Sequence, residues 1–130
     1  QIKIRAIFDL GKDYRKGGFL NRALKTFLDV AEQNPADVGI LEEIESIYEE
    51  LRDWENAYET RQKIARLDKG DHKHILAHYL VEAGKVCHEK GDLSRARSLF
   101  TKAISTHRRC VDAYLHLGDL HFAKQEYKKA

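Results

Sequence analysis

The sequence has no methionine, one proline, two cysteines and no long apolar stretch. The two cysteines, Cys87 and Cys110, are too few for a disulfide framework or for a four-ligand zinc site. One proline and eight glycines leave little turn chemistry for a sandwich of short strands. No apolar run approaches the ~20 residues that a membrane-spanning helix needs. These absences favour a helical domain without covalent or metal cross-links.

The composition is that of a folded chain with almost balanced charge. Hydrophobic residues make up 42% and charged residues 34% of the 130 residues, which is not a disordered composition. The net charge of +2 is lower than a general nucleic-acid binder normally carries, so we expect no nucleic-acid partner. The length suits one domain, over residues 1–130. Because methionine is absent even at position 1, we expect an internal segment of a longer protein.

One sequence motif recurs along the chain. A small residue marks each copy, at spacings of 34, 39 and 34: Ala23, Ala57, Ala96 and Ala130. Upstream of the first, Ile7, Leu10, Gly11 and Tyr14 follow the spacing of one helix face. Each copy therefore predicts a pair of amphipathic helices. Since no single pair buries both its faces, neighbouring pairs must stack into a solenoid.

This pattern resembles the tetratricopeptide repeat family, whose repeat places Leu, Gly and Tyr in one helix and Ala and Phe in the next. Gly11, Tyr14, Ala23, Phe27 and Pro35 match it in the first copy. The resemblance implies an all-α solenoid, a right-handed superhelix of antiparallel helix pairs. The repeats are expected at about 4–37, 38–71, 77–110 and, truncated, 111–130. An insertion near 72–76 is expected to form either a longer loop or an extension of the following helix.

In this family the first helix of each repeat lines a concave groove that binds polypeptides. The resemblance therefore implies the following peptide-binding groove: Arg5, Phe8, Asp9, Lys12, Arg15, Glu42, Glu43, Ser46, His78, Glu82, Lys85, Asp119 and Phe122. The formal charge is +1 over 4–37, −5 over 38–71 and +5 over 72–110, which can orient a charged peptide. The alternative is an ordinary solvated set of helix faces. Phe8 and Phe122 are the expected anchors, since buried aromatic residues dominate interface energy.

Some family members clamp the C-terminal carboxylate of a chaperone with Lys, Asn and Arg side chains. The corresponding positions here are Phe8, Lys12, Glu43, His78 and Glu82. Two carboxylates therefore replace hydrogen-bond donors and repel a peptide carboxylate. We reject the chaperone-tail interpretation.

Neither a metal site nor an enzyme is predicted. His74 and His78 are spaced to share a helix face, but a metal ion needs three or four converging ligands. The sequence has no GxxxxGK[ST] phosphate loop, no GxSxG and no HExxH. We therefore expect a non-enzymatic chain that binds no metal or other cofactor.

Glu45 and Arg61 occupy unusual positions in the second repeat. Glu45 replaces the glycine of the motif and Arg61 replaces the aromatic residue. Both positions are expected near the helix crossing, so we predict an ion pair partly shielded from water. The alternative is that both side chains reach solvent independently.

The truncated fourth repeat is expected to expose apolar residues. Tyr114, Leu117 and Leu120 are predicted to form an uncovered face, which favours self-association. His121 takes the place of the repeat tyrosine and is predicted to be packed and hydrogen-bonded.

The succession of repeats also resembles the middle repeats of the bacterial lipopolysaccharide assembly protein B family. The segments LAHYLVEAG, with Ala77, His78 and Glu82, and RDWENA, with Trp54, support this resemblance. It implies an adaptor that couples lipopolysaccharide synthesis to degradation of the committed-step deacetylase by a membrane-bound protease. It also implies a cytoplasmic repeat domain anchored at the inner membrane. The family's membrane helix and C-terminal rubredoxin-like metal module lie outside this chain.

The same family has been labelled a predicted N-acetylglucosaminyl transferase, which gives an alternative. The chain would then be the substrate-recognition arm of a transferase whose catalytic domain is absent here. Such an arm is expected to carry rows of asparagines in its groove. The chain has Asn21, Asn34 and Asn56, and none of them is in the predicted groove.

Overall fold

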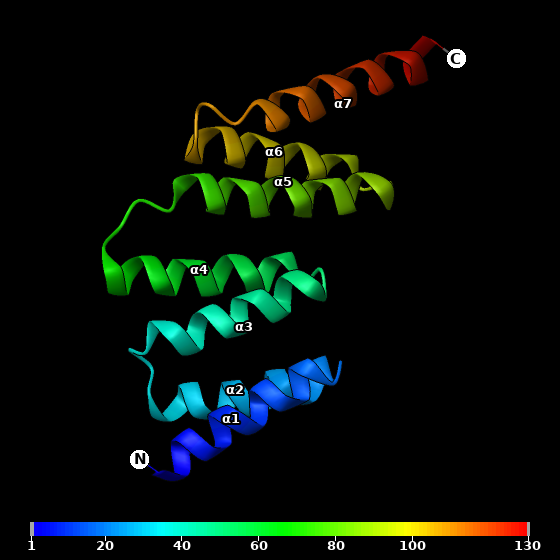
Figure 1. Cartoon of the computed structure of the whole chain (residues 1–130). Coiled ribbons are helices and arrows are strands. Elements are labelled where there is room, and N and C mark those ends of the chain that lie inside the picture. The colour runs from blue at the N-terminus through cyan, green and yellow to red at the C-terminus, as the bar shows by residue number, and fades with distance from the viewer. Residues whose placement is uncertain (1, 130) are drawn as a thin grey trace. The chain divides into compact units, whose positions relative to one another are not determined.

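The computed structural model describes the backbone of residues 2–129 and the side chains of residues 3–121. The described backbone consists of helices joined by short turns and contains no strand. The helices are α1 (Ile2–Lys16), α2 (Leu20–Gln33), α3 (Val38–Glu50), α4 (Trp54–Asp68), α5 (Lys73–Glu89), α6 (Leu93–Thr106) and α7 (Val111–Lys129). Figure 1 shows α1 with α2, α3 with α4 and α5 with α6 as antiparallel pairs. The all-α prediction is confirmed.

Aspartates begin several of the helices. The carboxylates of Asp37, Asp53 and Asp92 accept hydrogen bonds from the backbone N–H three residues later, at 3.3, 3.4 and 3.2 Å. A carboxylate at this position satisfies an N–H that has no partner within the helix and favourably meets the positive end of the helix dipole. Asp53 and Asp92 are thus the N-caps of α4 and α6.

The three helix pairs share one type of turn. The amides of Phe19, Asp53 and Asp92 donate to the carbonyls of Tyr14, Tyr48 and Cys87, each at 2.9 Å. The residue before each of these amides has a positive φ: 83° at Gly18, 58° at Arg52 and 84° at Gly91. Glycine adopts this left-handed conformation without steric cost, whereas Arg52 adopts it with some strain. The recurrence of this turn explains why all three helix pairs fold back alike.

The chain divides into two compact units, residues 1–70 and 71–130. In the first unit, α1 to α4 enclose a core of Ala23, Phe27, Val30, Ile40, Leu41, Ile44, Ile47 and Ile64. In the second, α5 to α7 bury Ala77, Tyr79, Leu80, Val81, Ala96, Phe100, Ala103, Ala113 and Leu120. The three repeat-marking alanines, Ala23, Ala57 and Ala96, are all fully buried. Small side chains at these points allow the paired helices to approach closely.

An aromatic ring covers a glycine in two of the helix pairs. A Cβ atom added to Gly11 would lie 2.8 Å from the Phe27 ring, and one added to Gly84 would lie 2.5 Å from the Phe100 ring. In the second pair the same two positions hold Glu45 and Arg61. Arg61 Nε donates to Glu45 Oε2 at 2.6 Å, and a second hydrogen bond joins Arg61 Nη2 to Glu45 Oε1. The predicted shielded ion pair is confirmed.

The segment near 72–76 extends a helix. Residues 73–76 form the first turn of α5, which has 17 residues where α3 has 13. Lys69, directly after α4, has the left-handed conformation. The carboxylate of Asp68 accepts from the Gly70 amide, and that of Asp71 accepts from the amide of Lys73 at the start of α5. Among the described residues, no helix is both long and apolar enough to cross a membrane.

The structure corrects the predicted orientation of α7. Leu120 is buried and His121 is exposed, so both predictions for these residues are wrong. Tyr114 is exposed as predicted, together with Val111 and Leu115. His116 instead stacks on Phe100, with the ring centroids 5.3 Å apart. The helix is thus rotated so that His116 faces α6 and Leu120, one turn further on, is covered.

Candidate functional site

The predicted groove residues of the first unit come from two helices. α1 carries Arg5, Phe8, Asp9, Lys12 and Arg15, and α3 carries Glu42, Glu43 and Ser46. Arg5, Asp9, Lys12 and Glu42 are exposed, whereas Phe8, Arg15, Glu43 and Ser46 are partly buried. The exposed members are available to a ligand. The partly buried members form the contacts between helices described next.

Arg15 joins α1 to α3. Its guanidinium donates to Glu43 Oε2 at 2.8 Å, to Ser46 Oγ at 2.6 Å and to Glu50 Oε1 at 2.8 Å. The hydrogen bond to Glu50 is the main cause that raises the pKa of the Arg15 guanidinium, and burial opposes it. The structure thus brings three predicted groove residues together and adds Glu50. The basic and acidic charges of the two repeats partly neutralise each other here.

Phe8 contacts both the core and a cation. Its ring meets Phe27 edge to face, with centroids 5.4 Å apart and an interplanar angle of 61°. The ammonium group of Lys12 lies 4.9 Å from the centroid of the Phe8 ring, within cation–π range. The surface therefore presents a partly buried aromatic ring with a cation next to it.

A cleft of about 500 Å³ adjoins Phe8. It is lined by Ile4, Arg5, Phe8, Val30, Asn34, Asp37, Gly39 and Ile40. Arg5 and Asp37 place opposite charges at its edge, and the apolar residues come from three helices. The repeat pattern did not indicate Asn34, Asp37 or Gly39, because these residues lie in or beside the α2–α3 turn and on no periodic helix face.

The predicted residues of the second unit lie on α5 and α7. On α5, Lys85 Nζ donates to Glu82 Oε1 at 3.3 Å, and His78 lines a pocket of about 240 Å³. That pocket is also lined by His74, Val81, Arg109, Cys110, Val111 and Asp112. Asp119 is exposed on α7. Phe122 belongs to α7, but its side chain lies outside the described residues.

The pocket beside His78 carries one guanidinium and one carboxylate together with two imidazoles, those of Arg109, Asp112, His74 and His78. Within the part of the chain whose side chains are described, no three His, Cys, Asp or Glu residues are placed to hold a metal ion.

The fold is similar to that of tetratricopeptide repeat domains. A family model described as tetratricopeptide repeat matches residues 89–130. Among solved structures, the N-terminal domain of stress-induced protein-1 from C. elegans superposes with a TM-score of 0.59 and 20% identity, over 92% of this chain and 94% of that one. The Yersinia enterocolitica type III secretion chaperone SycD, solved with a peptide of the translocator YopD, gives 0.54 and 14%, over 95% and 96%. The predicted tetratricopeptide repeat fold is confirmed.

In sequence, the chain is similar to lipopolysaccharide assembly protein B. The Escherichia coli K12 protein is 27% identical over 128 residues, and the Haemophilus influenzae protein is 24% identical over the same length. Both alignments include 98% of this chain, against 33% and 32% of the relatives. The chain thus spans about a third of the length of these relatives. The predicted resemblance to this family is confirmed.

Proposed function

We propose that this chain is a non-enzymatic scaffold that binds a polypeptide segment on the surface formed by α1 and α3. The observation that carries the proposal is the cleft beside Phe8, where a partly buried aromatic ring adjoins apolar residues and two exposed cations. Apolar concave sites with a few directed polar groups are typical of ligand-binding sites. An aromatic anchor at such a site supplies most of the binding energy.

Arg5 and Lys12 favour a segment in which a carboxylate adjoins an apolar side chain, and Asp37, which also lines the cleft, favours a basic group in the same segment. Arg5 lines the cleft and Lys12 lies above the Phe8 ring. The ion pairs of Arg15 with Glu43 and Glu50 hold α1 and α3 in fixed relation. A site held in this way loses little conformational freedom when it binds, which favours affinity.

The cellular role that we propose is that of an adaptor in the regulation of lipopolysaccharide biosynthesis. The support is the similarity to lipopolysaccharide assembly protein B, which extends over 98% of this chain. The partners would be a membrane-bound protease and the committed-step deacetylase that it degrades. We propose that the longer protein acts at the cytoplasmic face of the bacterial inner membrane. The metal module that the family resemblance implies is no part of this chain.

The double variant Phe8→Ala/Lys12→Glu tests the proposed surface. It should weaken capture of the purified deacetylase or protease at least tenfold, since it removes the anchor and reverses a neighbouring charge. The matched control is Phe19→Ala/Lys25→Glu, which makes the same changes at exposed positions outside the cleft. Circular dichroism verifies that both variants keep their helicity. Unchanged capture by the first variant, or equal loss in the control, refutes the assignment.

The transferase arm remains the second candidate because Asn34 lines the cleft. Its amide, however, donates to the carbonyl of Val30 in its own helix at 3.4 Å. Asn21 and Asn56 line no part of this cleft. A radiolabelled glycosyl-transfer assay on the full-length protein separates the two candidates. Transfer that depends on a domain outside this chain would favour the transferase arm over the adaptor.

A further inference from the structure

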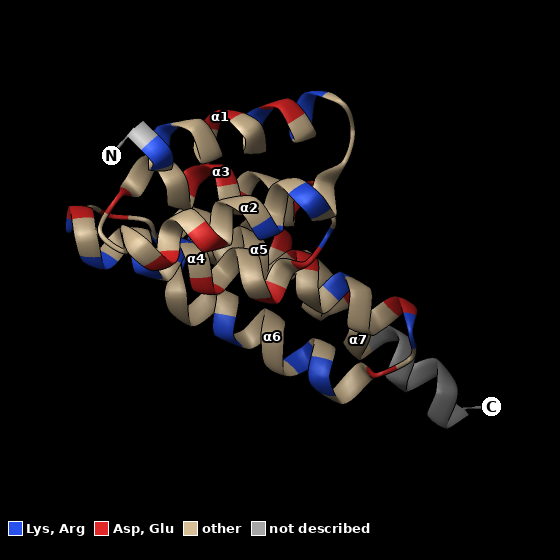
Figure 2. Cartoon of the chain, turned by 90° about the horizontal axis from the view of Figure 1, so that it is seen from below, with Lys and Arg blue, Asp and Glu red and all other residues tan. Residues whose placement is uncertain are grey.

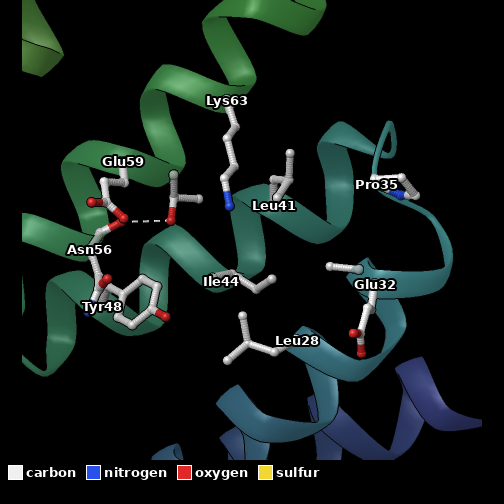
Figure 3. Close-up of a pocket in the computed structure, with 11 residues that line it drawn as sticks. Leu28, Glu32, Pro35, Leu41, Ile44, Tyr48, Asn56, Glu59 and Lys63 are labelled. Atoms are coloured by element: carbon white, nitrogen blue, oxygen red, sulfur yellow. Dashed lines mark hydrogen bonds between the residues drawn. The ribbon is translucent and has the colours of Figure 1, made fainter.

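A second pocket, of about 420 Å³, lies in the first unit among α2, α3 and α4 (Figure 3). None of the thirteen predicted groove residues lines it. The lining residues are Leu28, Ala31, Glu32, Pro35, Leu41, Ile44, Tyr48, Asn56, Glu59, Thr60 and Lys63. The pocket is therefore distinct from the cleft beside Phe8.

The floor of the pocket is apolar. Leu41 and Ile44 of α3 belong to the core and are only 6% and 2% exposed, so their positions are fixed. Leu28 of α2 is 42% exposed, and Figure 3 shows it directed toward Ile44. A large apolar side chain this exposed at the edge of a pocket gains contact when a second apolar side chain enters.

The rim of the pocket is polar and mainly acidic. Glu32 lies on the α2 side, and Glu59 and Lys63 lie on the α4 side. Among the described residues, neither Glu32 nor Glu59 forms an ion pair. The Thr60 hydroxyl donates to the Asn56 carbonyl at 2.7 Å, so this donor is already used within α4. Two carboxylates thus face an incoming segment, with one ammonium group between α4 and the floor.

The residues around the pocket are also mainly acidic. Residues 20–68 contain six Lys and Arg residues against twelve Asp and Glu residues. α3 carries glutamates and no basic residue, and it shows red without blue in Figure 2. The potential over this part of the unit is therefore negative, which attracts basic segments and repels acidic ones.

We propose that this pocket is a second docking site, which takes a leucine-like apolar side chain of a partner protein segment flanked by lysine or arginine. The apolar side chain contacts Leu28, Leu41 and Ile44. The flanking basic groups meet Glu32 and Glu59. The Lys63 ammonium group is then positioned to donate to a backbone carbonyl of the segment. The chain would thus hold two segments of different charge, one at each site.

The probe is a fluorescein-labelled synthetic peptide in which two leucines are flanked on both sides by lysines. Fluorescence anisotropy should show saturable binding that weakens as salt is raised. Peptides with glutamate in place of lysine, or serine in place of leucine, should bind at least tenfold more weakly. If either control peptide binds as tightly as the lysine–leucine peptide, the proposal is overturned, because the proposed site requires both charge and apolar contact.

Two variants and two controls locate the site. Glu32→Lys/Glu59→Lys should weaken binding about tenfold or more, and Leu28→Ala about threefold to tenfold, because charge attraction and apolar contact are lost separately. Asp13→Lys/Asp29→Lys makes the same change in net charge at exposed positions outside the pocket and should bind like the unchanged protein. Thermal unfolding verifies that all variants fold. Equal weakening by Asp13→Lys/Asp29→Lys overturns the proposal.

The remaining outcomes separate this site from the cleft and from self-association. Phe8→Ala/Lys12→Glu should leave binding of the lysine–leucine peptide unchanged, even though it weakens binding at the cleft. If that variant no longer binds the peptide, the peptide binds at the cleft and the proposal is overturned. Peptide binding that falls as the protein concentration rises, together with dimers in sedimentation, overturns it in favour of a second copy.

Discussion

Removal of Arg61 gives the most direct test of how the second helix pair is held together. The Glu45 side chain is 5% exposed and that of Arg61 is 15% exposed, so water screens their ion pair poorly. Arg61→Ala leaves a buried carboxylate without this guanidinium, and losses of this kind cost about 3–5 kcal/mol. A free energy of 1 kcal/mol shifts the melting temperature by ~4–8 °C in a unit of this size. We expect a decrease of at least ~12 °C in the first unit.

The compensating variant is Glu45→Gly/Arg61→Phe, which installs the glycine and aromatic ring found at the same positions in the neighbouring pairs. Replacement of a buried ion pair by well-packed apolar groups is often neutral or stabilising by about 1–4 kcal/mol. We therefore expect the double variant to unfold near the temperature of the unchanged protein. Urea unfolding followed by circular dichroism measures both variants.

Two results would refute this reasoning. A loss below ~1 kcal/mol in Arg61→Ala would mean that the pair behaves as an exposed one. A double variant as unstable as Arg61→Ala would mean that the second pair does not pack like its neighbours. Arg61→Lys is an internal control. Its compact ammonium group does not reproduce the two-pronged contact of Arg61, so its loss should be intermediate.

Three further predictions concern glycine, turn strain and pH. Gly84→Ala should destabilise the protein by about 1–3 kcal/mol because the added Cβ meets the buried Phe100 ring. Gly118→Ala, with open space around it, should stabilise the protein by up to about 1 kcal/mol. Thermal unfolding measures both, and the opposite order of stabilities would refute the packing argument. Arg52→Gly should stabilise by about 1 kcal/mol because it relieves a positive φ, and Gly91→Ala should do the reverse at the equivalent turn, both measured by urea unfolding. Burial, followed by the charges of Asp53 and Glu59, raises the pKa of Tyr48 above 10.0 in the folded state. The unfolded chain therefore loses this proton first, and the contribution of Tyr48 to stability is complete below pH 10 and is lost as pH rises through the folded pKa. Above pH 10, the free energy of unfolding should fall more steeply with pH for the unchanged protein than for Tyr48→Phe. Parallel curves of this free energy against pH would contradict the raised pKa of Tyr48.

The sequence by itself determined the repeating helix pairs, their caps and the unusual pair in the second repeat. Apolar spacing identifies a helix face because the helical period fixes which residues share it. Asp53 and Asp92 were predictable as caps, since capping depends on residues within one turn. Glu45 and Arg61 were predictable as partners because the neighbouring repeats supply an equivalent contact at the same positions.

Only the tertiary structure decided which charges are free and which apolar residues are covered. Arg15 lies 28 to 35 residues from its carboxylate partners, and that contact depends on how α1 and α3 are rotated and offset. The rotation of α7 likewise buries Leu120 and exposes His121, the reverse of what the sequence predicted. The pocket bounded by Leu28, Glu32 and Glu59 likewise arises from side chains of three helices. Local periodicity fixes which residues share a helix face. The rotation and offset of each helix against its neighbours come from packing in three dimensions, and these decide which faces meet.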